Sequence, residues 1–479
     1  MSDTSFARRV ASSVLYSGLG SVSARLLNAG ALFYTLKVIT EEEFGIAALA
    51  LAFFKSVKAL TELGLGAAIV QERRIGRTQV DSLFWVSFLL SLVVYVIIFI
   101  TAPLIAAFYD TPVLSSMIRV YMLGIIVFSF YMISSKLLMR NLEFKKLAIS
   151  DNVALAISAG LMAYLANQGY GAWAIILAEL ANKVGQMVFC LFYKPYWPRL
   201  TFRYRKVKHL ISFGVYTTGS NFFQNFYMNA DYLIIGKFFS MQLVGIYSFA
   251  YRIVFDTVKE LSNVINKVAY PAFSKLQFQL PRLRNYFYTI IRASMLLVGT
   301  VMIIIGIYID WILPLVGYEK WLDAVPYIQI FVMAGIFQCL ITLLPKLLNA
   351  KGKAKLVLYY TSANAVLLPA SFLVTAQFSM MAVAVVWLTV YPVLSLFIIY
   401  HGANITETAV TEFSLKSFSA LTTLLPLAVF TYAVRYAIEA NVAEVTLPII
   451  LGAAVFVLSV AAVVIWYREQ EAIQAIRKG

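Results

Sequence analysis

The sequence predicts an all-α polytopic membrane protein with fourteen transmembrane helices, in which two six-helix lobes of the same orientation are followed by two further helices. Three observations predict this fold: recurrent apolar stretches, positive charge confined to alternate loops, and an internal repeat. The 479-residue chain is 61% hydrophobic and only 13% charged, yet its formal net charge is +16. This composition leaves no room for a large soluble domain. The positive charge indicates membrane topology and not a nucleic-acid-binding surface.

Fourteen apolar stretches are each long enough to cross the hydrocarbon core, which takes about 20 residues in a helix. The first follows Arg8-Arg9 as a signal peptide would, but it continues to Leu36 without a convincing cleavage site, so we expect it to be retained. Short segments with Gly, Pro or Asn separate most pairs, so consecutive helices should be antiparallel. The predicted spans are 11–36, 44–70, 82–107, 113–135, 147–165, 171–193, 209–236, 242–270, 286–308, 325–348, 355–376, 379–400, 414–437 and 446–467.

Lys and Arg residues gather in every second loop. The loops between these contain little positive charge, and several of them contain acidic residues instead. By the positive-inside rule, the basic loops and both termini face the cytoplasm. The basic segments are 8–9, 73–77, 136–146, 194–208, 275–284 and 346–355.

The chain repeats itself at an offset of about 200 residues. Gly45 aligns with Gly245 at an offset of 200, and after a slip of one residue Phe54 aligns with Phe255. Six helices return the chain to its starting side, so the two copies have the same orientation and are related by an axis along the membrane normal. We therefore predict an N-terminal lobe at 1–200, a C-terminal lobe at 201–405, and helices 13 and 14 with a cytoplasmic tail at 406–479.

Charged residues inside the predicted spans each cost roughly 2.5–3.5 kcal/mol at a helix centre, so each requires a reason. They concentrate on helices 1, 2, 7 and 8, which the repeat relates in pairs, and helical spacing places many of them on one face. This layout is typical of a transporter with a central cavity. The predicted cavity cations are Arg25, Lys55, Lys58, Arg252 and Lys259, and its other polar or coupling residues are Asn28, Glu62, Asn221, Asn225, Asp231 and Asp256.

The balance of charge in these helices favours an anionic ligand. Five cations accompany four carboxylates, Glu62, Asp231, Asp256 and Glu260. When the carboxylates pair or take up protons, a phosphate or pyrophosphate head group is the natural partner of the remaining cations. The alternative for any single residue is a structural ion pair or snorkelling to the interface. Six further charged residues are weaker candidates, and snorkelling is the favoured interpretation for most of them because they lie within a turn or two of a predicted end. They are Arg119, Asp151, Glu179, Lys183, Lys267 and Arg292.

The sequence contains no recognisable catalytic or metal-binding motif. Cys190 and Cys339 both fall in predicted spans, and His209 and His401 are the only histidines. We therefore expect no enzymatic activity, no metal site and no cofactor.

Short motifs distributed over essentially the whole chain resemble those of a known family. This is the polysaccharide transport family of oligosaccharide-lipid flippases, within the multidrug/oligosaccharidyl-lipid/polysaccharide exporter superfamily. The resemblance is strongest to its exopolysaccharide or colanic-acid-type branch. The matching motifs are Phe44-Gly45, Leu63-Gly64 followed by Ile69-Val70-Gln71, the Arg140–Phe144 loop, Pro271–Gln277 and Gly317–Trp321.

The resemblance implies a flippase that moves an undecaprenyl-pyrophosphate-linked oligosaccharide repeat unit across the bacterial inner membrane. Movement would be from the cytoplasmic to the outer leaflet by alternating access, for exopolysaccharide, capsule or O-antigen assembly. It also implies an ion gradient or the membrane potential as the driver, with H⁺ or Na⁺ as the coupling ion. Glu62, Asp231 and Asp256 are the carboxylates to test for coupling. Expected partners are the lipid bilayer and the polysaccharide polymerase and export machinery, with the protein itself a monomer.

Three alternatives stay open at this point. A lipid II flippase for peptidoglycan typically has fourteen helices and a cationic cavity, but the motifs favour the exopolysaccharide branch. An ion-coupled drug exporter of the same superfamily should have a more acidic cavity and usually twelve helices. A membrane-embedded glycosyltransferase or polymerase normally has large external loops and catalytic carboxylates.

Overall fold

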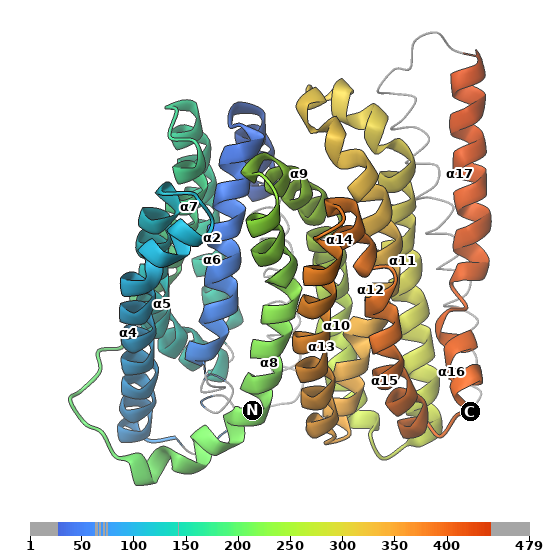
Figure 1. The fold of residues 1–479 in the computed structure, drawn as a ribbon. Coiled ribbons are helices and arrows are strands. Elements are labelled where there is room, and N and C mark those ends of the chain that lie inside the picture. The colour runs from blue at the N-terminus through green and yellow to red at the C-terminus, as the bar shows by residue number, and fades with distance from the viewer. Residues whose placement is uncertain are drawn as a thin grey trace. The chain divides into compact units, whose positions relative to one another are not determined.

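The computed structural model describes residues 27–441, apart from residues 63–65, 67–68, 70–71, 73–74 and 142. Every regular element in these residues is a helix, which confirms the predicted all-α class (Figure 1). The chain divides into two compact units, Met1–Gly245 and Ile246–Gly479. The predicted lobe boundaries near residues 200 and 405 stay predictions.

Unit 1 is a bundle in which α2 has a central place. α2 packs against α5, α7 and α8, while α5, α6 and α7 pack on one another. α2 and α8 run side by side in Figure 1. After a helical stretch at residues 27–38, the elements of unit 1 are α2 (Glu41–Glu62), α4 (Arg77–Phe108), α5 (Val113–Arg140), α6 (Phe144–Asn167), α7 (Ala172–Tyr193), α8 (Tyr204–Phe238) and the start of α9 (Met241–Tyr251).

Unit 2 is built around α12, which packs against α10, α11, α13 and α15. Its elements after α9 are a π-helix η1 (Arg252–Asp256), α10 (Thr257–Leu276), α11 (Leu280–Leu315), a 3₁₀-helix η2 (Glu319–Ala324), α12 (Val325–Ala350), α13 (Ala354–Thr375), α14 (Met380–Val386), α15 (Val390–Ile405), α16 (Val410–Ser417) and α17 (Leu421–Asn441).

The described residues contain nine segments that are long and apolar enough to cross a membrane, and each overlaps a predicted span. α2, α8 and the helix from α9 to α10 cover three further predicted spans but contain more polar residues. The first predicted span lies mostly outside the described residues, and the last lies wholly outside them. The helical multi-span fold is therefore confirmed, while the count of fourteen stays a prediction.

Two predicted spans are interrupted. The span at 379–400 is divided between α14 and α15, and the span at 414–437 between α16 and α17. At the first break, the N–H of Leu388 donates to the carbonyl of Val385 at 2.9 Å, and at the second, Leu421 donates to Phe418 at 2.9 Å. These i→i−3 bonds replace the i→i−4 bonds of an α-helix and tighten the turn. A hydropathy pattern does not distinguish an interrupted helix from a continuous one.

Two glycines bring the first turns of α2 and α9 into direct backbone contact. A Cβ on Gly45 would lie 2.0 Å from the carbonyl oxygen of Met241, and a Cβ on Gly245 would lie 1.9 Å from that of Glu41. Glu41 and Met241 differ by the same 200 residues as the glycines. The two turns therefore meet through matching surfaces, and the contact follows the internal repeat.

The π-helix η1 explains the slip in the repeat. The offset between the two copies is 200 at Ala50 and Ala250, and 201 at Phe54 and Phe255. A π-helical turn accommodates one extra residue within an α-helix, and η1 begins at Arg252, inside that interval. The extra residue is absorbed there, so Lys259 occupies the position that corresponds to Lys58.

Candidate functional site

The two predicted cations of α2 lie in unit 1 at positions of different exposure. Lys55 is exposed and Lys58 is half-buried. The Lys58 ammonium lies 4.1 Å from the centroid of the Phe128 ring on α5. An aromatic face stabilises a cation in this position. Arg25 and the side chain of Glu62 lie outside the described residues.

A third lysine, Lys183 on α7, joins this region. Its Nζ lies 4.9 Å from the ring of Phe54 and 5.3 Å from the ring of Tyr121, and it pairs with Glu179 at 3.4 Å. Lys58 is close enough to repel it electrostatically. Snorkelling, which the sequence favours for most of the weaker candidates, does not describe Lys183, because this residue lies near the middle of α7 and contacts rings from α2 and α5.

The polar residues of α8 fall into an exposed and a buried set. Asn221 and Asn225 are exposed, whereas Asn229 and Asp231 are buried. Asn225 donates through Nδ2 to the carbonyl of Asn221 at 2.8 Å, and Asn229 donates likewise to Asn225 at 2.7 Å. One Asp231 carboxylate oxygen accepts from the N–H of Tyr232 at 2.9 Å. Asp231 is therefore placed inside the packed unit.

The half-buried Asn28 belongs to the helical stretch at 27–38 that precedes α2. Of the cavity residues predicted on the first span, Asn28 is the one that falls within the described part of the chain. Its backbone lies in a regular helix, as predicted.

In unit 2 the predicted residues lie on and after the π-helix η1. Arg252 is half-buried, while Asp256 and Lys259 are exposed. The offset of 201 matches Lys58 with Lys259 and Lys55 with Asp256. Each unit thus has two charged positions at the same places in the repeat. Unit 1 has a cation at the position where unit 2 has a carboxylate.

The described residues contain no group of three or more His, Cys, Asp or Glu side chains placed to hold a metal ion. Within unit 1, the described candidate residues provide lysine ammonium groups, the Glu179 carboxylate that pairs with Lys183, two exposed asparagine side chains and aromatic faces. Ammonium groups bind phosphate oxygens as point charges, and asparagine side chains donate and accept hydrogen bonds from hydroxyl-rich ligands.

Comparison with known proteins identifies similar sequences. A family model described as polysaccharide biosynthesis protein matches residues 37–326. The chain is 25% identical over 318 residues to the teichuronic acid biosynthesis protein TuaB of Bacillus subtilis, a match that spans 66% of each chain. It is 25% identical over 342 residues to the lipopolysaccharide biosynthesis protein WzxC of Escherichia coli, covering 71% of this chain and 68% of WzxC. The succinoglycan biosynthesis transport protein ExoT of Rhizobium meliloti is 22% identical over 246 residues, covering 51% of this chain and 50% of ExoT.

Solved structures of transporters have a similar fold. The lipid II flippase MurJ in an inward closed conformation matches 95% of this chain and 99% of its own, with a TM-score of 0.72 and 12% identity. An inward-facing multidrug resistance MATE family transporter of the MOP superfamily matches 80% of this chain and 96% of its own, with a TM-score of 0.60 and 15% identity. At these identities the likeness describes the fold alone.

Proposed function

Because the chain belongs to the family of polysaccharide biosynthesis proteins, we propose that it is a flippase for lipid-linked oligosaccharides. Its cargo would be an undecaprenyl-pyrophosphate-linked repeat unit, moved from the cytoplasmic to the outer leaflet by alternating access. The product would serve exopolysaccharide, capsule or O-antigen assembly. The names of the relatives support a polysaccharide cargo, and ExoT is named as a transport protein.

The observation that carries the proposal is the group of lysines within unit 1. Lys58 and Lys183 lie on helices that pack together, at positions where hydrocarbon would penalise an ammonium group. A pyrophosphate with several sugars cannot cross hydrocarbon unaided, whereas a polyprenyl tail cannot leave it. A helical bundle with internal cations and a lateral opening to lipid accommodates both parts of such a molecule.

The alternatives have weaker support. The fold likeness to a lipid II flippase rests on 12% identity and does not extend to its cargo. An exporter of cationic drugs would be expected to have carboxylates where α2 has Lys55 and Lys58, because a cationic ligand binds negative charge. The sequence relatives with polysaccharide names match at 22–25% identity, which also favours a glycan cargo.

Coupling, location and assembly complete the proposal. H⁺ or Na⁺ would drive transport, and among the described carboxylates the exposed Asp256 is better placed to meet an ion than the buried Asp231. The protein would lie in the bacterial inner membrane with both termini in the cytoplasm, working as a monomer beside a polysaccharide polymerase and export machinery. The charge pattern of the loops supports this orientation.

The test is removal of the cations without loss of the protein. In cells whose own flippase gene is deleted, Arg25→Gln and Lys58→Gln should each abolish surface polysaccharide while the amount of protein in the membrane is unchanged. Lys55→Gln should be milder if Glu62, seven residues further along α2, is its main partner. The control is Glu319→Gln at an exposed position in η2, which should have no effect. Normal export by the Arg25→Gln, Lys58→Gln double variant would refute the proposed head-group site.

A further inference from the structure

The linker that joins α7 to α8, residues 194–203, is fixed to the first turns of α4. Tyr196 donates its hydroxyl to the Asp81 carboxylate at 2.7 Å, and Arg77 pairs with the same carboxylate at 3.3 Å. The Arg77 guanidinium also lies over the Tyr196 ring, 4.6 Å from its centroid. Asp81 is only 1% exposed. The first half of the linker is therefore held by a buried polar cluster.

The rest of the linker is attached at two further points. The indole N–H of Trp85 donates to the carbonyl of Arg199 at 2.8 Å, and the backbone N–H of Arg203 donates to the hydroxyl of Ser82 at 3.0 Å. Burial and the neighbouring charge of Asp81 raise the pKa of Tyr196, so its hydroxyl keeps the proton that this cluster requires at any physiological pH. The linker is a defined structure along its whole length.

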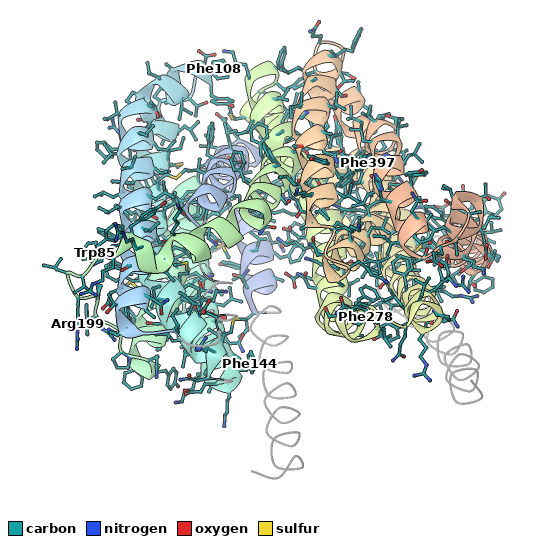
Figure 2. The ribbon with its side chains drawn as sticks, turned by 90° about the horizontal axis from the view of Figure 1, so that it is seen from below. Trp85, Phe108, Phe144, Arg199, Phe278 and Phe397 are labelled. Carbon is teal, nitrogen blue, oxygen red and sulfur yellow. The ribbon has the colours of Figure 1, made fainter. Side chains whose placement is uncertain are left out.

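This fixed linker presents large apolar side chains to its surroundings. Trp197 is 70% exposed and Leu200 is 89% exposed, although the backbone around them is anchored. Phe202 and Tyr204 are also exposed. Figure 2 shows Arg199 beside Trp85 at the edge of unit 1. Exposed apolar patches with a polar rim usually mark an interaction surface.

Cations alternate with these apolar residues. Arg199, Arg203 and Arg205 are all exposed and lie within the same short segment as Trp197 and Leu200. The partner must therefore combine an apolar phase with negative charge. A bilayer surface that contains anionic phospholipids has both properties, and aromatic and basic residues are enriched at that depth.

The place of the linker in the fold favours a lipid surface over a soluble partner. The linker begins directly after α7 and is attached to the start of α4, and both helices are apolar enough to span the membrane. It thus lies at the level where two spans leave the hydrocarbon. We propose that residues 194–205 bind anionic phospholipid head groups at this membrane surface, with Trp197 and Leu200 inserted among the head groups. The proposal does not depend on the cargo or on the lysines of unit 1.

Spin labelling at Leu200 tests this proposal. A Leu200→Cys variant is labelled with a nitroxide; Cys190 and Cys339 are both fully buried and do not compete. In nanodiscs of phosphatidylcholine mixed with phosphatidylglycerol, the ratio of oxygen to nickel-complex accessibility should place the label at head-group depth. In phosphatidylcholine alone the label should lie closer to water. This comparison needs no further substitution.

Neutralising the arginines provides the second comparison. In the Arg199→Gln, Arg203→Gln, Arg205→Gln variant, the ratio of inserted to water-exposed label should fall about fivefold for each arginine removed. The matched control removes three exposed cations elsewhere, with Arg282→Gln, Lys353→Gln and Lys355→Gln, and should leave the label where it is. A label that stays in water in both lipid mixtures, or one whose depth is independent of the three arginines, would overturn the proposal. A label that becomes shielded only when cytosolic protein is added would also overturn it.

Discussion

At the scale of single residues, Lys183 is held by groups from three helices. It pairs with Glu179 of its own helix, and rings from α2 and α5 lie against its ammonium group. A Cβ on Gly124 would lie 2.9 Å from its Cδ, so α5 also fits closely around its stem. These contacts assign Lys183 a packing role in addition to its charge.

We therefore expect Lys183→Gln to destabilise the protein, because it removes the ion pair with Glu179 and the contacts of the ammonium group with two aromatic rings. The cost should be about 1–3 kcal/mol, measured as a lower unfolding temperature of the purified protein in detergent. The Glu179→Gln, Lys183→Gln double variant should recover part of this loss, since it removes both charges. If the double variant is less stable than Lys183→Gln alone, the ion pair is not the source of the stability that Lys183 contributes.

The sequence locates the lysines of this region but not their surroundings. Lys55 and Lys58 were identifiable because they interrupt an apolar stretch whose repeat partner also carries a lysine. Lys183 has no such partner, although its i,i+4 spacing from Glu179 was a usable signal. Which rings lie against each ammonium group depends on how α2, α5 and α7 pack, and periodicity does not contain that information.

At the scale of helices, the contact between α2 and α9 depends on the absence of two side chains. We expect Gly45→Ala and Gly245→Ala each to destabilise the protein by about 1–3 kcal/mol, since no rotamer change relieves an overlap between Cβ and a backbone oxygen. The unfolding temperature of the purified protein and the export of polysaccharide should both fall. The two variants should behave alike, because the contacts they disturb are equivalent in the repeat.

Gly160 in α6 provides the matched control. A Cβ at this position would meet no atom within 4 Å, so Gly160→Ala should be neutral or stabilising by up to about 1 kcal/mol. Wild-type stability and export in Gly45→Ala would mean that the first turns of α2 and α9 do not need to meet this closely.

The π-helix η1 shows how far a repeat can be interpreted from sequence. The slip of one residue is visible in the alignment of the two halves, but an extra residue can be absorbed by a loop, a kink or a π-helical turn. The structure places it in η1, within a helix that continues into α10. Each residue turns an α-helix by about 100°. Absorbing the extra one at η1 keeps Asp256 and Lys259 on the face that corresponds to Lys55 and Lys58.

At the scale of the whole chain, composition and charge pattern were sufficient to predict the fold class, because few structures other than helices can span a bilayer. They were less informative about the C-terminal region beyond residue 405. There α17 packs along α11, and Arg435 binds the Asp310 carboxylate through two hydrogen bonds of 2.9 and 2.8 Å. Tyr308 also donates to the carbonyl of Thr431 at 3.2 Å. The thirteenth predicted helix is thus an integral part of unit 2, which hydropathy alone does not reveal.

The orientation of the chain is the last prediction, and it rests on the loops. Basic residues resist translocation, so the loops that contain them should stay in the cytoplasm. Paired fusions to alkaline phosphatase and green fluorescent protein report opposite sides of the inner membrane. Fusions after Asn167, Glu319 and Gln377 should be active as phosphatase only, and fusions after Arg74, Arg199 and Lys353 should be fluorescent only.

These six fusion sites test the orientation of the protein separately from the arrangement of its spans. Asn167 lies at the end of α6 and Arg199 in the linker after α7, so a single span separates them and their reporters must differ. Glu319 and Lys353 are likewise separated by the span that ends at Ala350. A reversal at all six sites would invert the protein in the membrane and leave the repeat intact. A reversal at Asn167 or Arg199 alone would instead place the two sites on the same side, which would contradict α7 as the single span between them.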